Sequence, residues 1–189
     1  MNSSKVLTIA EFIPLLMLFR IAALVLFSFP VATAAEQLGT VSIIWDGEAQ
    51  DWFTISDGTG DALIASASLK SGERLSSISI QAHPKPKFSS KNVLSISLTY
   101  LGAFVPDTPP TGAEFIYTTN GMRPPFYTSA GAPVAPTVTV EGYEATQQDG
   151  QLTGTFSATL CLANDLYGDV DTNDCKELSG SFNTGIVLR

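Results

Sequence analysis

Two segments near the C-terminus decide the fold: Leu152–Leu162, with the sequence LTGTFSATLCL, and Leu178–Leu188, with the sequence LSGSFNTGIVL. Each begins with Leu-Thr/Ser-Gly-Thr/Ser-Phe, and a cysteine lies on the inner flank of each, Cys161 in the first and Cys175 just before the second. We interpret the segments as the two strands of an antiparallel hairpin that a Cys161–Cys175 disulfide closes.

The cysteines also predict the register of this hairpin. If they lie directly opposite each other, Gly154 faces Phe182 and Phe156 faces Gly180. Each phenylalanine ring then covers a glycine on the partner strand, which shields bare backbone and holds the strands in register. This register follows from the cysteines alone. The placement of each phenylalanine opposite a glycine therefore supports the Cys161–Cys175 pair independently.

In this register one face of the hairpin is apolar and the other is polar, as a sheet with one buried face requires. The apolar face carries Phe156, Ala158, Leu160, Leu162, Leu178, Phe182, Ile186 and Leu188, with Thr184 as its polar member. The other face carries Ser and Thr residues and both cysteines, so we expect the disulfide on the outer face. It closes a loop of about 15 residues, which is worth about 3 kcal/mol in the chain-entropy model.

Residues 1–34 have the features of a secretory signal peptide. Lys5 and Arg20 supply positive charge, Ile21–Phe29 is a short apolar run, and small residues precede a cleavage position after residue 34 or 35. The alternative is an uncleaved membrane anchor. Cleavage leaves residues 35–189 as a single domain without a membrane span, in the periplasm or outside the cell.

The exported part of the chain is acidic. The whole chain has a net charge of −8, and the leader contributes Lys5, Arg20 and Glu11, which leaves −9 for the remaining residues. This charge argues against nucleic acid and anionic membrane surfaces as partners and slightly favours cationic ligands. Two cysteines behind an export signal are typical of one disulfide.

The rest of the chain predicts strands. Alternating, β-branched and aromatic runs are bounded by Gly, Pro, Asp and Asn. We expect strands at Leu38–Trp45, Trp52–Ser56, Ala62–Leu69, Leu75–Gln81, Val93–Leu101, Ala113–Thr119 and Pro136–Ala145, followed by the two C-terminal strands. The prediction is an all-β, antiparallel two-layer sandwich of about 8–9 strands, with a closed or partly open β-barrel as the alternative.

Two proline-rich loops are candidate binding sites, since long ordered loops often carry function. They are Ala82–Ser90 and Gly121–Pro136, and the second carries Arg123, Phe126 and Tyr127, which we predict as binding residues for a protein or glycan partner. The alternative is that the loops cover a sheet edge or bridge the sheets.

Further aromatic residues flank an acidic turn. Trp45 and Trp52 lie on either side of Asp46–Glu48. Such rings supply contact area in sugar- or peptide-binding modules. The alternative is that they belong to the core.

The sequence contains no catalytic constellation that we recognise. His83 is the one histidine, and its proline- and lysine-rich setting predicts a solvated surface loop. No G-x-S-x-G, H-E-x-x-H, C-x-x-C or phosphate-binding glycine loop is present. We therefore predict no catalytic residues and favour a non-enzymatic binding or structural domain, with a hydrolase that uses paired carboxylates as the alternative.

The loop inside the disulfide is a candidate calcium site. Its possible oxygen ligands are Asp165, Asp169, Asp171, Asn173 and Asp174. The spacing starts like an EF-hand loop but departs from it, with an aspartate where the motif needs glycine and a glycine where it needs glutamate. The alternative is a solvated connection rich in turn-forming residues. If the loop does bind calcium, the protein is a calcium-stabilised structural subunit, and we expect no other cofactor.

The layout resembles a group of exported bacterial all-β domains with no assigned function. The matching residues are Ile44, Asp46 and Gly47 in the first predicted strand and turn, and the Gly-x-Phe segments Gly154–Phe156 and Gly180–Phe182 in the last two. The resemblance implies an all-β fold and a cell-envelope or secreted setting, and it supplies no catalytic residue.

Overall fold

The structure is a computed structural model that describes residues 35–165 and 168–189. The part of the chain so described is all-β. It contains eleven strands and one 3₁₀ turn, η1 (Gly60–Ala62). The strands are β1 (Glu36–Trp45), β2 (Glu48–Asp57), β3 (Ile64–Ala65), β4 (Ala67–Lys70), β5 (Leu75–Ala82), β6 (Val93–Leu101), β7 (Gly112–Asn120), β8 (Arg123–Thr128), β9 (Thr137–Ala145), β10 (Asp149–Ala163) and β11 (Val170–Leu188). The all-β prediction is confirmed.

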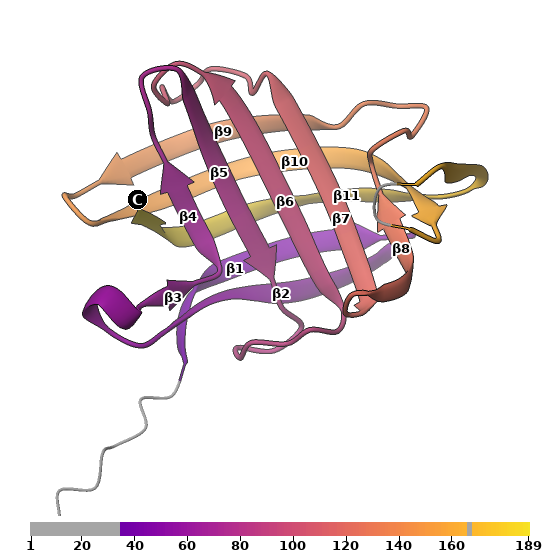
Figure 1. The fold of residues 1–189 in the computed structure, drawn as a ribbon, viewed down its shortest axis with the longest axis horizontal. Helices are drawn as coiled ribbons and strands as arrows, with labels where there is room; N and C mark the ends of the chain where they lie inside the picture. The colour runs from indigo at the N-terminus through magenta and orange to yellow at the C-terminus, as the bar shows by residue number, and fades with distance from the viewer. Residues whose placement is uncertain (1–34, 166–167) are drawn as a thin grey trace, which may run out of the picture. The chain divides into compact units, whose positions relative to one another are not determined.

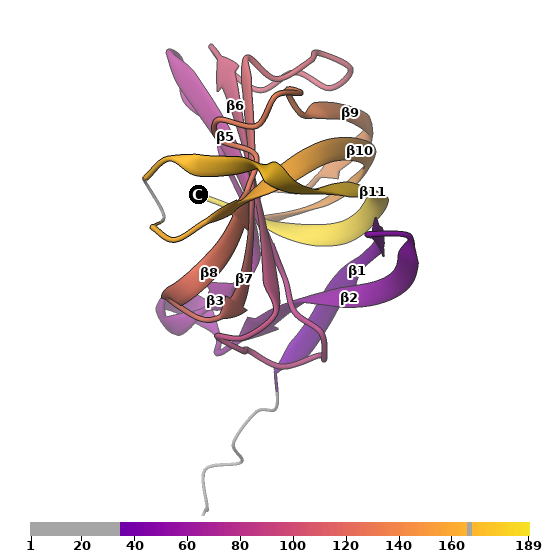
Figure 2. The ribbon, with the colours of Figure 1, turned by 90° about the vertical axis from the view of Figure 1, so that its right-hand side faces the viewer.

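The strands form two layers. The hydrogen-bonded order is β3-β2-β1-β11-β4-β5-β6-β7-β8-β10-β9, with a further pairing of β10 with β11. In Figure 1, β4 to β7 cross in front of β9, β10, β11, β1 and β2, and Figure 2 shows the two layers from the side. The pairings between named strands are antiparallel except β11 with β4, where Val187 and Leu188 lie beside Ser68 and Leu69. The predicted two-layer sandwich is therefore confirmed, although its sheet is mixed.

The predicted hairpin register is confirmed. Gly154 lies opposite Phe182, Phe156 opposite Gly180, and the two cysteines opposite each other. A Cβ atom at Gly154 would collide with the Phe182 ring, and one at Gly180 would collide with backbone of β1 as well as with the Phe156 ring, 2.9 Å away. Each ring covers a glycine that could not carry a side chain.

The Cys161–Cys175 disulfide is present, and its two cysteines differ in exposure, since Cys175 is half-buried. Cys161 is fully buried. The pairing shifts beyond it, so that Leu162 lies opposite Asp171 and three residues form a bulge. This bulge folds back onto the disulfide, where Cys175 Sγ lies 3.4 Å from the carbonyl oxygen of Thr172.

The strand count exceeds the prediction for two reasons. The predicted strand Ala62–Leu69 is divided into β3 and β4 after the 3₁₀ turn. The predicted loop Gly121–Pro136 contains β8, which the Pro124-Pro125 pair concealed because proline cannot donate to a ladder. The two prolines lie where the β7–β8 pairing is irregular, a position that a strand tolerates.

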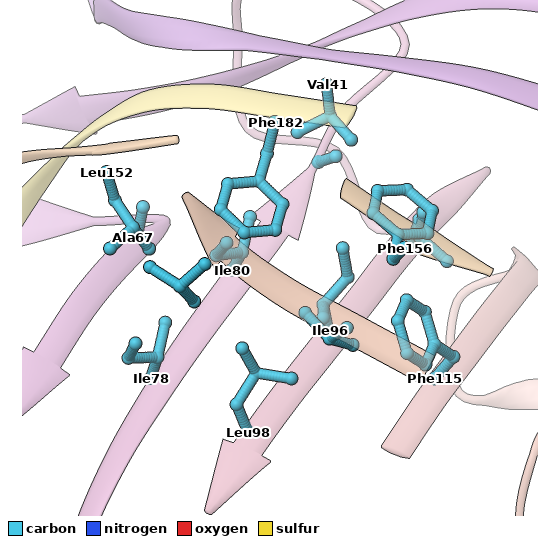
Figure 3. Close-up of a cluster of buried hydrophobic side chains, with 14 of the residues drawn as sticks. Val41, Ala67, Ile78, Ile80, Ile96, Leu98, Phe115, Leu152, Phe156 and Phe182 are labelled. Atoms are coloured by element: carbon cyan, nitrogen blue, oxygen red, sulfur yellow. The ribbon is translucent and has the colours of Figure 1, made fainter. Parts of the chain in front are cut away.

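The core lies between the layers (Figure 3). Phe156 and Phe182 from the hairpin stack at 6.4 Å between ring centroids. Aliphatic side chains of β5 and β6 meet them from the other layer, among them Ile80 and Ile96, both fully buried. Thr184, the polar member of the predicted apolar face, is satisfied there by a 2.6 Å hydrogen bond to Thr54 of β2.

The predicted signal peptide, residues 1–34, lies outside the described residues. Within the described part of the chain, no helix is long and apolar enough to cross a membrane.

Candidate functional site

Aromatic side chains that are far apart in the sequence converge where the two layers meet at one end of the sandwich. Trp45 and Trp52 come from β1 and β2, and Tyr117 and Tyr127 come from β7 and β8 of the other layer. The Trp45 ring lies 5.0 Å from Tyr117 and 5.5 Å from Tyr127 between centroids, and Trp52 lies 5.4 Å from Tyr117. We call these four rings, together with Lys176 and Asp46, the aromatic end.

A tight turn positions Trp45. It connects β1 to β2 through Asp46 and Gly47, whose φ angles are 51° and 85°. Positive φ at both positions matches the Asp-Gly turn that hairpins favour. The Asp46 amide donates to the carbonyl of Glu177 at 3.1 Å, so the turn is attached to β11. The Asp46 carboxylate therefore lies beside the strand that carries Lys176.

The tyrosines are held by strand pairing. Tyr117 lies directly opposite Tyr127 in the β7–β8 ladder, so both rings project from the same face. The Tyr117 hydroxyl donates to Asn92 Oδ1 at 3.3 Å, and burial raises the pKa of this phenol. Trp45, Tyr117 and Tyr127 are only half-buried, whereas Trp52 is buried and bonded to Gln50.

Lys176 places a positive charge over these rings. It lies opposite Leu160 in the hairpin, so it occupies the inner face just beyond the apolar run of β11. Its Nζ donates to Asp46 Oδ2 at 2.7 Å and lies 5.9 Å from the Trp45 centroid and 5.7 Å from the Tyr127 centroid. The hydrogen bond to Asp46 is the main reason that the pKa of Lys176 is raised.

Sequence reasoning missed Tyr117 and Lys176, although both left a signal. Lys176 is the inward-facing residue that precedes Leu178 in the predicted register, and a lysine opposite Leu160 is unexpected on an apolar face. Tyr117 follows Phe115 by two residues in a predicted strand, so it belongs to the same face. Only the packing of the two layers brings them together.

The structure separates the predicted binding residues Arg123, Phe126 and Tyr127. Arg123 is exposed at the start of β8, and Phe126 is buried. Tyr127 alone contributes to the aromatic end. There it joins Trp45 and Trp52, which stand out in the sequence because they flank an acidic turn.

The prediction that His83 lies on a solvated surface is wrong. It is 2% exposed, and its backbone forms a bridge with Phe53. The Ser89 amide donates to Nδ1 at 3.2 Å, and the Phe88 ring lies 5.4 Å away, so the proline-rich loop folds over the imidazole. Burial lowers the pKa of His83.

The acidic hairpin loop contains local turn bonds. Asp171 Oδ1 accepts from the amide and the side chain of Asn173 at 2.9 and 3.2 Å. Over residues 35–165 and 168–189, no three His, Cys, Asp or Glu side chains are grouped to hold a metal. Calcium binding by Asp165, Asp169, Asp171, Asn173 and Asp174 stays a prediction. If the ion binds, calcium raises the melting temperature and a chelator restores the original value.

An open hollow of about 580 Å³ lies between β7 and the hairpin tip. Two carboxylates line it, Glu114 from β7 and Asp169 from the acidic loop, and both residues are exposed. A general acid needs a carboxyl group whose pKa is raised, which usually means removal from water. Both carboxylates of the hollow are instead open to water.

Comparison of the chain with protein-family models, with curated proteins and with solved structures found no match.

Proposed function

We propose that this protein is an exported, non-enzymatic binding module and that its ligand contacts the aromatic end. One observation carries the proposal: three half-buried rings, Trp45, Tyr117 and Tyr127, meet from three strands, and the ammonium of the Lys176–Asp46 ion pair lies over two of them, Trp45 and Tyr127. Large amphipathic rings with a polar rim are the usual material of binding surfaces. The disulfide and the leader sequence support an oxidising, extracytoplasmic location.

The proposal moves the predicted binding surface. The sequence favoured the loop around Arg123 and the loop Ala82–Ser90, but the second is occupied in covering His83. Tyr127 is the residue that connects the earlier expectation to the aromatic end. The partner class stays the same, a protein or a glycan.

The test is a screen of the purified protein on glycan and peptide arrays, followed by two variants. Tyr127→Ala removes one wall of the aromatic end, and we expect the affinity for any bound array member to fall at least tenfold. Met122→Ala is the matched control, because Met122 is 78% exposed and lies in the turn before β8. Binding that survives Tyr127→Ala, or that is lost equally in both variants, contradicts the proposal.

A hydrolase is the second candidate. Glu114 and Asp169 are the carboxylates it would pair, because they line one hollow, although both are exposed to water. Glu114→Gln and Asp169→Asn separate the two functions. A hydrolytic activity that both variants abolish, without a change in array binding, supports the hydrolase.

A further inference from the structure

The corner between Trp45 and Tyr127 already holds a cation. Their ring planes are inclined by 78°, and the Lys176 ammonium lies over both, within the range of about 6 Å at which a ring attracts a positive charge. The Asp46 carboxylate contacts the same nitrogen and supplies the opposite charge. Tyr117 packs against Trp45 and extends the aromatic wall. The side chain of Lys176 thus occupies a site that is built, like a cation-binding site, from aromatic rings and a carboxylate.

Lys176 is an occupant that can leave. Its side chain is 28% exposed and that of Asp46 is 58% exposed, so water screens the ion pair. A lysine side chain is flexible, and its ammonium is strongly hydrated, which weakens its preference for an aromatic surface. An alkylated ammonium carries the same charge with far weaker hydration, and its methyl groups contact ring faces directly.

We propose that the aromatic end binds a quaternary ammonium group, which takes the place of the Lys176 ammonium between Trp45 and Tyr127 while Asp46 balances its charge. This inference rests on the proposed function as a binding module and names its ligand class. The net charge of −8 agrees with a cationic ligand, because an acidic protein attracts cations.

The test uses the intrinsic fluorescence of the full chain. Its two tryptophans, Trp45 and Trp52, both belong to the aromatic end, so the signal reports on this site. The probes are choline and its neutral isostere 3,3-dimethylbutan-1-ol. We expect Lys176→Ala, which vacates the corner, to bind choline at least tenfold more tightly than the unmodified protein. Lys70→Ala, an exposed lysine on β4, is the matched control and leaves the affinity unchanged.

A second variant tests the role of charge. Asp46→Asn, introduced into the Lys176→Ala protein, keeps a residue that tolerates the positive φ of this turn but removes the negative charge. We expect the affinity for choline to fall at least tenfold, with the melting temperature of the variant measured to show that it folds. Binding to vesicles of phosphatidylcholine is measured as well. A protein that binds choline but not the vesicles recognises a free small molecule, and a protein that binds both also recognises a lipid headgroup.

Three results overturn the inference. If the protein binds choline and the neutral isostere with equal affinity, the site does not recognise a positive charge. The aromatic end is then still a binding site, but not one for a quaternary ammonium group. The inference also fails if Lys176→Ala folds but does not bind choline more tightly than the unmodified protein. In that case the proposed function still stands if array binding depends on Tyr127. The inference fails as well if Asp46→Asn leaves the affinity for choline unchanged, because the negative charge of Asp46 would then not contribute to binding.

Discussion

The body of the C-terminal hairpin and the aromatic end differ in what their unusual residues do. In the hairpin, the repeated Gly-x-Phe segments are fully used by folding, because Phe156 and Phe182 cover Gly180 and Gly154. At the aromatic end, Lys176 of β11 lies over half-buried rings, on a face whose other polar member is Thr184. The difference indicates that the repeated segments of this chain serve its structure, whereas the departure from the apolar pattern lies where we propose that a ligand binds.

The largest expected effect comes from removing the disulfide. Replacing Cys161 and Cys175 with alanine is expected to lower the free energy of unfolding by about 3 kcal/mol, because a constraint on a loop of about 15 residues is lost. Urea unfolding measures the change. A loss below 1 kcal/mol would show that the hairpin does not need its covalent closure.

The glycine opposite Phe156 is the next test of the hairpin. Gly180→Ala places a Cβ against the backbone of Ser42 and Ile43, so we expect a loss of about 2 kcal/mol from overpacking. Gly112→Ala is the matched control, because its Cβ would lie 3.7 Å from the nearest atom. Equal stability of the two variants would contradict the assigned role of Gly180.

At the aromatic end we expect a much smaller effect on stability. Lys176→Ala breaks an ion pair that is open to water, which costs about 0–1 kcal/mol. Urea unfolding again measures the change, with Gly180→Ala as the reference. A loss as large as that of Gly180→Ala would mean that Lys176 is a structural residue, and the contrast between the two regions would fail.

The smallest effect concerns pH. The pKa of His83 is lowered in the folded state from an unfolded value of 6.5, so the unfolded chain gains the proton first. The associated stability is complete above pH 6.5 and declines as the pH falls through 6.5 toward the folded pKa. We expect the melting temperature to fall between pH 7.5 and 5.5, and to fall less in His83→Asn. An identical decline in both proteins would contradict this.

The sequence predicted what depends on neighbouring residues and local pairing. Strand periodicity predicted the all-β class. The cysteines, with Gly154 and Gly180, predicted the register, because one known residue pair fixes all the other pairs of an antiparallel hairpin. The position of His83 was mispredicted because its burial depends on Phe53 of β2, which its own loop does not reveal. The aromatic end was missed as a unit because Trp45 and Tyr117 meet only when two separate layers pack.

The most direct measurement is an NMR titration of Lys176→Ala with tetramethylammonium, observed at the two indole N–H signals. We expect a saturable shift, larger for Trp45 than for the buried Trp52, and no saturable shift with sodium chloride at the same ionic strength. A folded variant whose Trp45 signal does not move, or moves equally with sodium chloride, would contradict the claim that the aromatic end is a site for a cationic ligand.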